Sequence, residues 1–117
     1  MDFLERNKAL FAEIEEKIAK DPQNVENYLI LGKLYVMGGL FDKAIDVYGE
    51  LLKIDPLSTQ ALVNTGSIYF FKKEYQKAID TFSRVLETDE ANFSAYYNLG
   101  NTYAELKNYN QAMHSYK

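Results

Sequence analysis

Few residues in this sequence could do catalytic chemistry. The chain has one histidine, His114, and no cysteine, which excludes thiolate metal sites and cysteine nucleophiles. His114 follows Met113 with no cluster of partners, so we expect a surface histidine rather than a base or ligand. A run of glutamates (Glu13, Glu15 and Glu16) fits a solvated helix face. The sequence therefore predicts no enzyme, no metal site and no cofactor.

Side-chain amides offer a different chemistry, which is recognition of a peptide backbone. Asn64, Asn98 and Asn101 each carry a hydrogen-bond donor and an acceptor, as an extended main chain requires. Asn64 and Asn98 are 34 residues apart. Apolar side chains lie near these asparagines in the sequence, including Phe70, Phe71 and Tyr97. They could contact hydrophobic anchors of a ligand.

The spacing of 34 residues recurs along most of the chain. Small and aromatic residues repeat in register, and such a fixed period is typical of repeat proteins. The repeated series are Gly32, Gly66 and Gly100; Tyr35, Tyr69 and Tyr103; Ala44, Ala78 and Ala112; Phe41, Tyr75 and Tyr109; and Tyr48, Phe82 and Tyr116.

Each period predicts two helices. Tyr28, Leu31, Gly32 and Tyr35 have the i, i+3, i+4, i+7 spacing of one helix face, and Gly38-Gly39 then permits a tight turn. A second helix begins near Phe41 and ends before Asp55-Pro56. We expect the aromatic rings of the repeated positions to be structural and buried in the core, namely Tyr28, Tyr35, Phe41, Tyr48, Tyr69, Tyr75, Phe82, Tyr96, Tyr103, Tyr109 and Tyr116.

The run Tyr28-x2-Leu31-Gly32-x2-Tyr35, then Ala44-x3-Tyr48, then Pro56, resembles the tetratricopeptide repeat. The third unit matches the same pattern, and the middle unit departs from it at Leu62 and Thr65. The resemblance covers about residues 25–117 and implies an all-α fold. We expect a right-handed superhelical solenoid of antiparallel helix pairs, with about seven helices in all.

The predicted organisation is an N-terminal capping helix in 1–24, then repeats at 25–58, 59–92 and 93–117. The capping helix should run over residues 3–20, with Asp2 as its N-cap and Glu5 in the capping-box position. Asn92 or Ser94 could cap the first helix of the third repeat. We expect that repeat to be truncated within its second helix, either because the chain is a fragment or because its open end pairs with another copy.

In tetratricopeptide arrays the first helix of each repeat lines a concave groove, so the resemblance implies where a ligand would bind. Asparagine in this family often holds the ligand main chain, which favours Asn64 and Asn98. The alternative for Phe70 and Phe71 is packing against a neighbouring repeat. The predicted peptide-binding residues are Leu29, Lys33, Met37, Val63, Asn64, Ser67, Phe70, Phe71, Tyr97, Asn98 and Asn101.

Some tetratricopeptide co-chaperones grip acidic C-terminal tails with a clamp of lysine, arginine and asparagine. Of that set this sequence keeps only Asn64, with Leu29 and Ser94 at two of the positions that require other residues. A two-carboxylate grip needs those cations. The clamp is therefore not expected here.

The overall composition limits the classes of partner that we expect. A net charge of −4 argues against nucleic acid, and no apolar run is long enough to span a membrane. Without a signal peptide or cysteine, we expect a cytoplasmic protein. The predicted function is a non-enzymatic scaffold that binds a partner peptide or amphipathic helix in the groove. The alternative is self-assembly into homo-oligomers through the open C-terminal edge, at Met113 and Tyr116.

Overall fold

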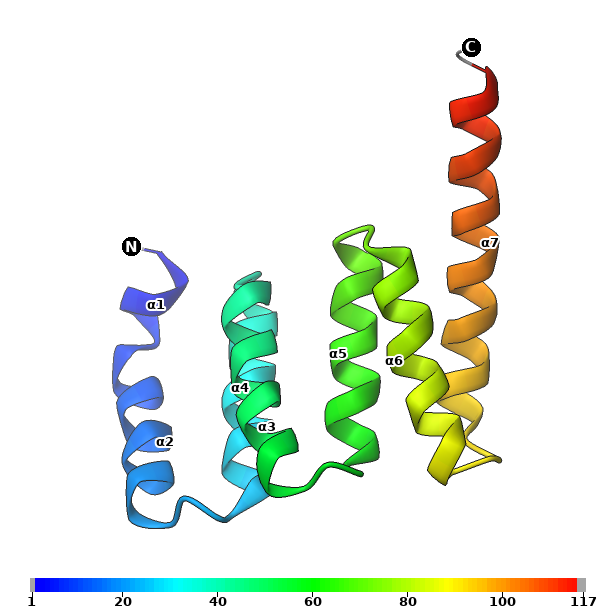
Figure 1. Cartoon of the computed structure of the whole chain (residues 1–117). Helices are drawn as coiled ribbons and strands as arrows, with labels where there is room; N and C mark the ends of the chain where they lie inside the picture. Colours follow the sequence, from blue (N-terminus) through cyan, green and yellow to red (C-terminus); the bar gives the residue numbers. More distant parts are fainter. Residues whose placement is uncertain (1, 116–117) are drawn as a thin grey trace. The chain divides into compact units, whose positions relative to one another are not determined.

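The structure is a computed structural model that describes the backbone of residues 2–115 and the side chains of residues 2–110. In that part of the chain all regular secondary structure is α-helical, which confirms the predicted all-α class. The chain divides into two compact units, Met1–Ala61 and Leu62–Lys117. The helices, labelled in Figure 1, are α1 (Phe3–Arg6), α2 (Lys8–Lys20), α3 (Val25–Met37), α4 (Phe41–Ile54), α5 (Thr59–Phe71), α6 (Tyr75–Thr88) and α7 (Phe93–Ser115).

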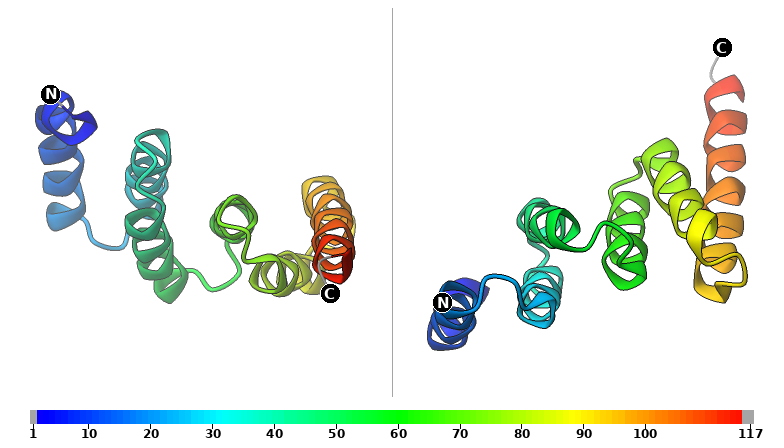
Figure 2. Two further views of the ribbon diagram at one scale, coloured as in Figure 1. Left: turned by 90° about the horizontal axis from the view of Figure 1, so that it is seen from above. Right: turned by 60° about the horizontal axis from the view of Figure 1, so that its bottom comes forward.

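The first unit contains the helix pair α3–α4, and the two helices lie side by side in Figures 1 and 2. At the start of α3, Asn24 Oδ1 accepts a hydrogen bond of 3.1 Å from the Glu26 amide, which satisfies one of the exposed donors. The turn after α3 places Gly39 at φ 73°, a left-handed conformation that glycine adopts without strain. The Tyr48 ring packs directly against Gly32, so the small residue at this position allows the close approach of the two helices.

The N-terminal segment departs from the prediction of one helix over residues 3–20. The helix is interrupted at Asn7, whose φ of −113° and ψ of 18° lie outside the α-helical values. Asn7 Nδ2 donates a hydrogen bond of 2.8 Å to the Phe3 carbonyl oxygen, the kind of local bond with which asparagine competes against helix continuation. The N-cap prediction is confirmed, because Asp2 Oδ1 accepts from the Glu5 amide at 2.9 Å.

The core of the first unit lies between α2 and α3. Phe11, Ile14 and Leu31 are buried, and Phe3 packs edge-on against Phe11 with the ring centroids 6.0 Å apart. Phe3 also lies against Gly38, where a larger side chain would collide with its ring. The apolar face of α2 therefore packs against α3.

The second unit repeats the same packing in α5 and α6. Phe82 is completely buried and its ring lies against Gly66, as Tyr48 lies against Gly32. The turn after α5 has Lys73 at φ 64°, the left-handed conformation that Gly39 adopts in the first unit. Ala95 and Thr102, both fully buried, attach α7 along α6, and the two helices run side by side in Figures 1 and 2.

The third repeat differs from its prediction, because α7 is one helix of 23 residues with no turn at Lys107. Leaving the helix there would place a lysine in the left-handed region, which costs about 1–2 kcal/mol. In the second repeat Lys73 adopts this conformation, and the helix that follows the turn packs its Phe82 ring against Gly66. In the third repeat no such packing is formed, because no neighbouring atom of the described residues lies within 4 Å of the Cβ position of Gly100. The helix therefore continues past Lys107 and keeps its backbone hydrogen bonds.

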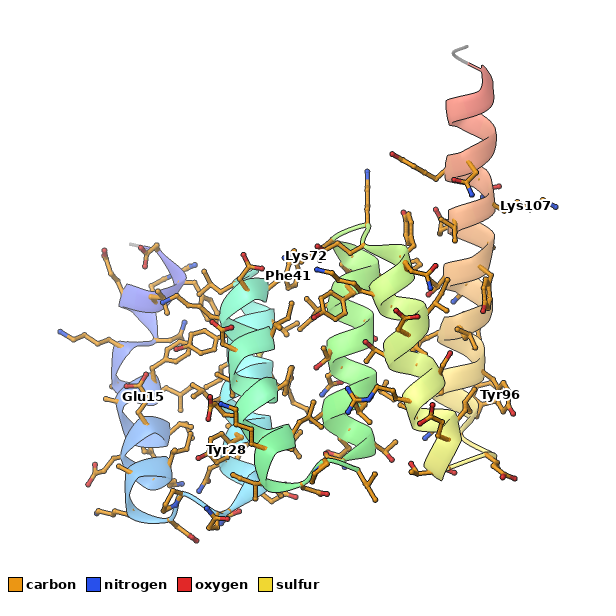
Figure 3. The ribbon with its side chains drawn as sticks, in the orientation of Figure 1. Glu15, Tyr28, Phe41, Lys72, Tyr96 and Lys107 are labelled. Carbon is orange, nitrogen blue, oxygen red and sulfur yellow. The ribbon has the colours of Figure 1, made fainter. Side chains whose placement is uncertain are left out.

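The expectation that the aromatic rings of the third repeat are buried was wrong. Tyr96, Tyr103 and Tyr109 are each more than half exposed. Figure 3 shows Tyr96 pointing away from α6. Within the described residues no second helix follows α7 to pair with it, as α4 pairs with α3 in the first repeat. No helix in the described part of the chain combines the length and apolar character needed to traverse a lipid bilayer.

Candidate functional site

A pocket of about 220 Å³ lies within the second unit. Three helices contribute to it, and five of its six lining residues are among those predicted to bind a peptide. The lining consists of Ser67, Phe70 and Phe71 from α5, Phe82 from α6, and Asn98 and Asn101 from α7. The structure therefore brings together residues that are up to 34 positions apart in the sequence.

The helical register explains why these side chains converge. Ser67, Phe70 and Phe71 have the i, i+3, i+4 spacing of one face of α5, and Asn98 and Asn101 share a face of α7 in the same way. The N-terminus of α7 is fixed by Asn92, whose Oδ1 accepts from the Ala95 amide at 2.8 Å. This confirms Asn92, of the two predicted caps, as the residue that bonds the first turn.

Aromatic rings form the apolar part of the pocket. Phe70 contacts Phe71 and Tyr75 edge-on, with centroid separations of 5.9 and 5.8 Å. Phe70 is half-buried by these contacts within its own unit, whereas Phe71 is 66% exposed. The pocket thus combines a fully buried ring, Phe82, with an accessible ring that a ligand can cover.

The polar part of the pocket consists of two amides and a hydroxyl. Asn98 is half-buried and Asn101 is exposed, and neither side chain has a hydrogen-bond partner among the described residues. The Asn98 backbone carbonyl, by contrast, accepts a bond of 2.7 Å from Thr102 Oγ1, which holds this turn of α7 in place. Two amides on a fixed helix can therefore donate to and accept from a ligand.

The remaining predicted residues of the second unit do not line this pocket. Val63 and Asn64 are half-buried on α5. Tyr97 is 61% exposed and stacks on Phe93, with the ring centroids 6.0 Å apart. Tyr97 and Phe93 together present an aromatic surface on α7, and Phe93 was not among the predicted binding residues.

The first unit corrects one prediction. Leu29 is only 5% exposed, so it is part of the core rather than of a ligand-binding surface. It lies three residues before Gly32 and shares its face, where α4 approaches closely. Lys33 and Met37 are exposed on α3, as a binding role requires.

Tyr35, a half-buried phenol in the first unit, has a shifted pKa. Burial raises the pKa of Tyr35 above its ordinary value of 10.0, and the negative charge of Glu15 raises that pKa further. Within the described residues no three His, Cys, Asp or Glu side chains are grouped so as to hold a metal ion. His114 and Met113 lie outside the residues whose side chains the structure describes.

Comparison with known proteins agrees with the pairing of helices. A family model described as "Tetratricopeptide repeat" matches residues 26–58, and another described as "TPR repeat" matches residues 66–107. The chain belongs to the tetratricopeptide repeat family. No curated protein sequence matches the chain.

Several solved tetratricopeptide structures resemble this one. A crystal structure of MamA is 30% identical, with a TM-score of 0.75 over 99% of this chain and 71% of that one. The first tetratricopeptide domain of Spaghetti (RPAP3), bound to the HSP90 peptide SRMEEVD, has a TM-score of 0.78 at 20% identity, over 87% of this chain and 81% of that one. The Sgt2 domain from Aspergillus fumigatus also has a TM-score of 0.78, at 16% identity, over 92% of this chain and 72% of that one. The last two likenesses concern the fold alone.

Proposed function

We propose that the chain is a cytoplasmic, non-enzymatic scaffold that binds a peptide or amphipathic helix of a partner protein. The observation that carries this proposal is the pocket of the second unit, which joins aromatic rings to side-chain amides without internal partners. Membership of the tetratricopeptide repeat family supports the general role in protein–protein interaction.

The size of the pocket favours one anchoring side chain. Its volume of about 220 Å³ is below the roughly 300 Å³ at which pockets for whole small molecules begin. A bulky apolar side chain of the partner would lie against Phe70 and Phe71. The burial of each additional CH₂ group contributes about 0.8 kcal/mol. The amides of Asn98 and Asn101 would bind the partner main chain on either side of that anchor.

The uncharged lining of the pocket argues against an acidic ligand group at this position. Among the described residues no lysine or arginine lines this pocket, so those residues do not supply the donors for a bidentate carboxylate grip. The related domain of Spaghetti is described as bound to a peptide with two adjacent glutamates. For the present chain we propose an apolar anchor at this pocket. Lys33 and Met37 of the first unit remain separate predictions.

A tryptophan reporter tests this proposal directly, because the chain contains no tryptophan of its own. Phe71→Trp would place a single fluorophore on the wall of the pocket. Peptides selected for binding to the wild-type chain from a random library are then titrated into the variant. Burial by an apolar anchor should shift the emission to shorter wavelength.

The matched control is Tyr109→Trp, an exposed aromatic position in the same unit that does not line the pocket. Its emission should not change on addition of the same peptides. Binding that shifts Tyr109→Trp and leaves Phe71→Trp unchanged would contradict the proposed site.

A second candidate function, self-association, is favoured by the exposed face of α7. In the first two repeats the equivalent glycines are covered by Tyr48 and Phe82, whereas Gly100 is open and Tyr96 and Tyr103 are each about half exposed. A helix from a second copy could occupy this face. The predicted contact residues Met113 and Tyr116 lie outside the described side chains.

Light scattering over a range of concentrations tests self-association. If copies pair through this face, the mass should rise toward a dimer, and Tyr96→Ser with Tyr103→Ser should restore the monomer. A monomer at every concentration would exclude the candidate.

A further inference from the structure

The first unit contains a second cleft, of about 350 Å³, where α1 and α2 meet the α3–α4 pair. It is lined by Leu4, Lys8, Phe11, Ala12, Glu15, Tyr35 and Lys43, none of which was predicted to bind a ligand. Tyr35 lies two residues from both Lys33 and Met37 along α3. Because successive helix residues are 100° apart, Tyr35 faces the side opposite the predicted groove.

The floor of the cleft is apolar. Phe11 is 6% exposed, and its ring lies against Tyr35 with the centroids 5.0 Å apart. The raised pKa of the Tyr35 phenol has burial as its main cause, which is consistent with a floor that is partly screened from water. Leu4 and Ala12 extend the same surface. A bulky apolar side chain would therefore find several contacts here.

Two lysines border this floor without an acidic partner. Lys43 Nζ lies 5.8 Å from the centroid of the Tyr35 ring, a cation–π contact. Neither Lys43 nor Lys8 forms an ion pair within the described residues, whereas Lys17 and Lys20 on the same unit pair with Glu13 and Glu16.

The second repeat contains the same cation–π pair, but there the lysine also forms an ion pair with a glutamate. Lys77 Nζ lies 5.6 Å from the Tyr69 ring, and both residues are 34 positions after their counterparts in the first repeat. Lys77 also pairs with Glu74 at 3.5 Å. In the first repeat Leu40 occupies the position of Glu74, so the charge of Lys43 has no such neighbour.

We propose that this cleft is a separate binding site for a peptide segment in which a bulky apolar side chain adjoins carboxylates. The apolar side chain lies on Phe11 and Tyr35, and Lys43 and Lys8 bind the carboxylates. Glu15, two helical turns or about 10 Å along α2 from Lys8, repels a carboxylate at its own end of the cleft.

The test uses a fluorescein-labelled peptide containing one phenylalanine followed by two glutamates, with fluorescence anisotropy as the measurement. We expect saturable binding that weakens at least fivefold when either Lys8→Glu or Lys43→Glu is introduced, and that weakens as salt is added. A peptide with serine in place of phenylalanine should bind at least fivefold more weakly. Because both lysines are exposed, these variants should fold normally.

The matched control is Lys53→Glu, which makes the same charge change at an exposed position of α4 that does not line the cleft. It should retain the wild-type affinity, and equal losses in all three variants would reduce the effect to net charge and overturn the site. Absence of binding to the wild type at millimolar peptide would overturn it as well. Phe71→Ala, in the pocket of the other unit, should leave this affinity unchanged, and a loss there would assign the peptide to that pocket instead.

Discussion

The Phe82 ring lies against the backbone of Gly66, with its nearest carbon 2.6 Å from the place a Cβ atom would occupy. Tyr48 makes the equivalent contact with Gly32. At Gly100, the third member of the series, no neighbouring atom of the described residues lies within 4 Å of the Cβ position. The glycine of this series thus contacts an aromatic ring of the second helix in the first two repeats and contacts no such ring in the third.

This difference predicts opposite effects of the same substitution. Gly66→Ala should lower the free energy of unfolding by about 1–3 kcal/mol, because the new methyl group collides with a ring that is completely buried. Gly100→Ala should raise it by up to about 1 kcal/mol, since alanine favours a helix interior and meets no neighbour. Denaturant unfolding followed by far-ultraviolet circular dichroism measures both changes. Equal effects of the two substitutions would contradict the packing described here.

The turn lysines provide a second paired prediction. Lys73 has φ 64°, so Lys73→Gly should stabilise the chain by about 0.5–1 kcal/mol through relief of backbone strain. Lys107 is within α7, where glycine disfavours the helix by about 1 kcal/mol. Lys107→Gly should therefore reduce helix content, as measured by circular dichroism. A gain in stability from Lys107→Gly would instead indicate a turn at that position.

The cap of α7 should matter for stability. Asn92 Oδ1 accepts from the Ala95 amide, and Asn92 Nδ2 donates to Asp89 Oδ2 at 3.0 Å. Asn92→Ala should cost about 1 kcal/mol of unfolding free energy, because the first turn of α7 loses its side-chain acceptor. Asn108→Ala, at an exposed position inside the helix, is the control and should change stability by less than about 0.5 kcal/mol.

Tyr35 predicts a dependence of stability on alkaline pH. Its pKa in the folded state is raised above 10.0, so folding favours the protonated phenol. The resulting stabilisation is fully present below pH 10.0 and is lost as the pH rises from there through the folded-state pKa. Tyr35→Phe should remove this part of the pH dependence in denaturant unfolding experiments. Tyr103→Phe, at an exposed ring, should leave it unchanged.

Repeated residue types predicted the family, the helix pairs and most of the pocket. Each prediction depended on residues within one helix or on a spacing that recurred in all three repeats, such as that of Gly32, Gly66 and Gly100. The face of α5 that carries Ser67, Phe70 and Phe71 follows from helical periodicity alone, which is why these residues were found in advance.

The errors arose where a neighbouring element, rather than the helix itself, decides the outcome. Periodicity places Leu29 at the edge of the core face, but its burial depends on how closely α4 approaches at Gly32. Tyr96 and Tyr103 occupy core positions of the repeat and remain exposed, because no second helix follows α7 within the part of the chain that the structure describes. The cleft around Tyr35 was missed because its residues come from four helices.

The central claim is that a partner protein binds at the pocket of the second unit. Ser67→Trp would fill this pocket, and Ser94→Trp makes the same change at an exposed position of α7 that does not line it. Both variants and the wild-type chain are used as baits in lysate of the source cell, after circular dichroism has shown equal helix content. We expect partner proteins retained by the wild type and by Ser94→Trp to be lost from Ser67→Trp. Retention of the same proteins by all three baits would contradict the claim.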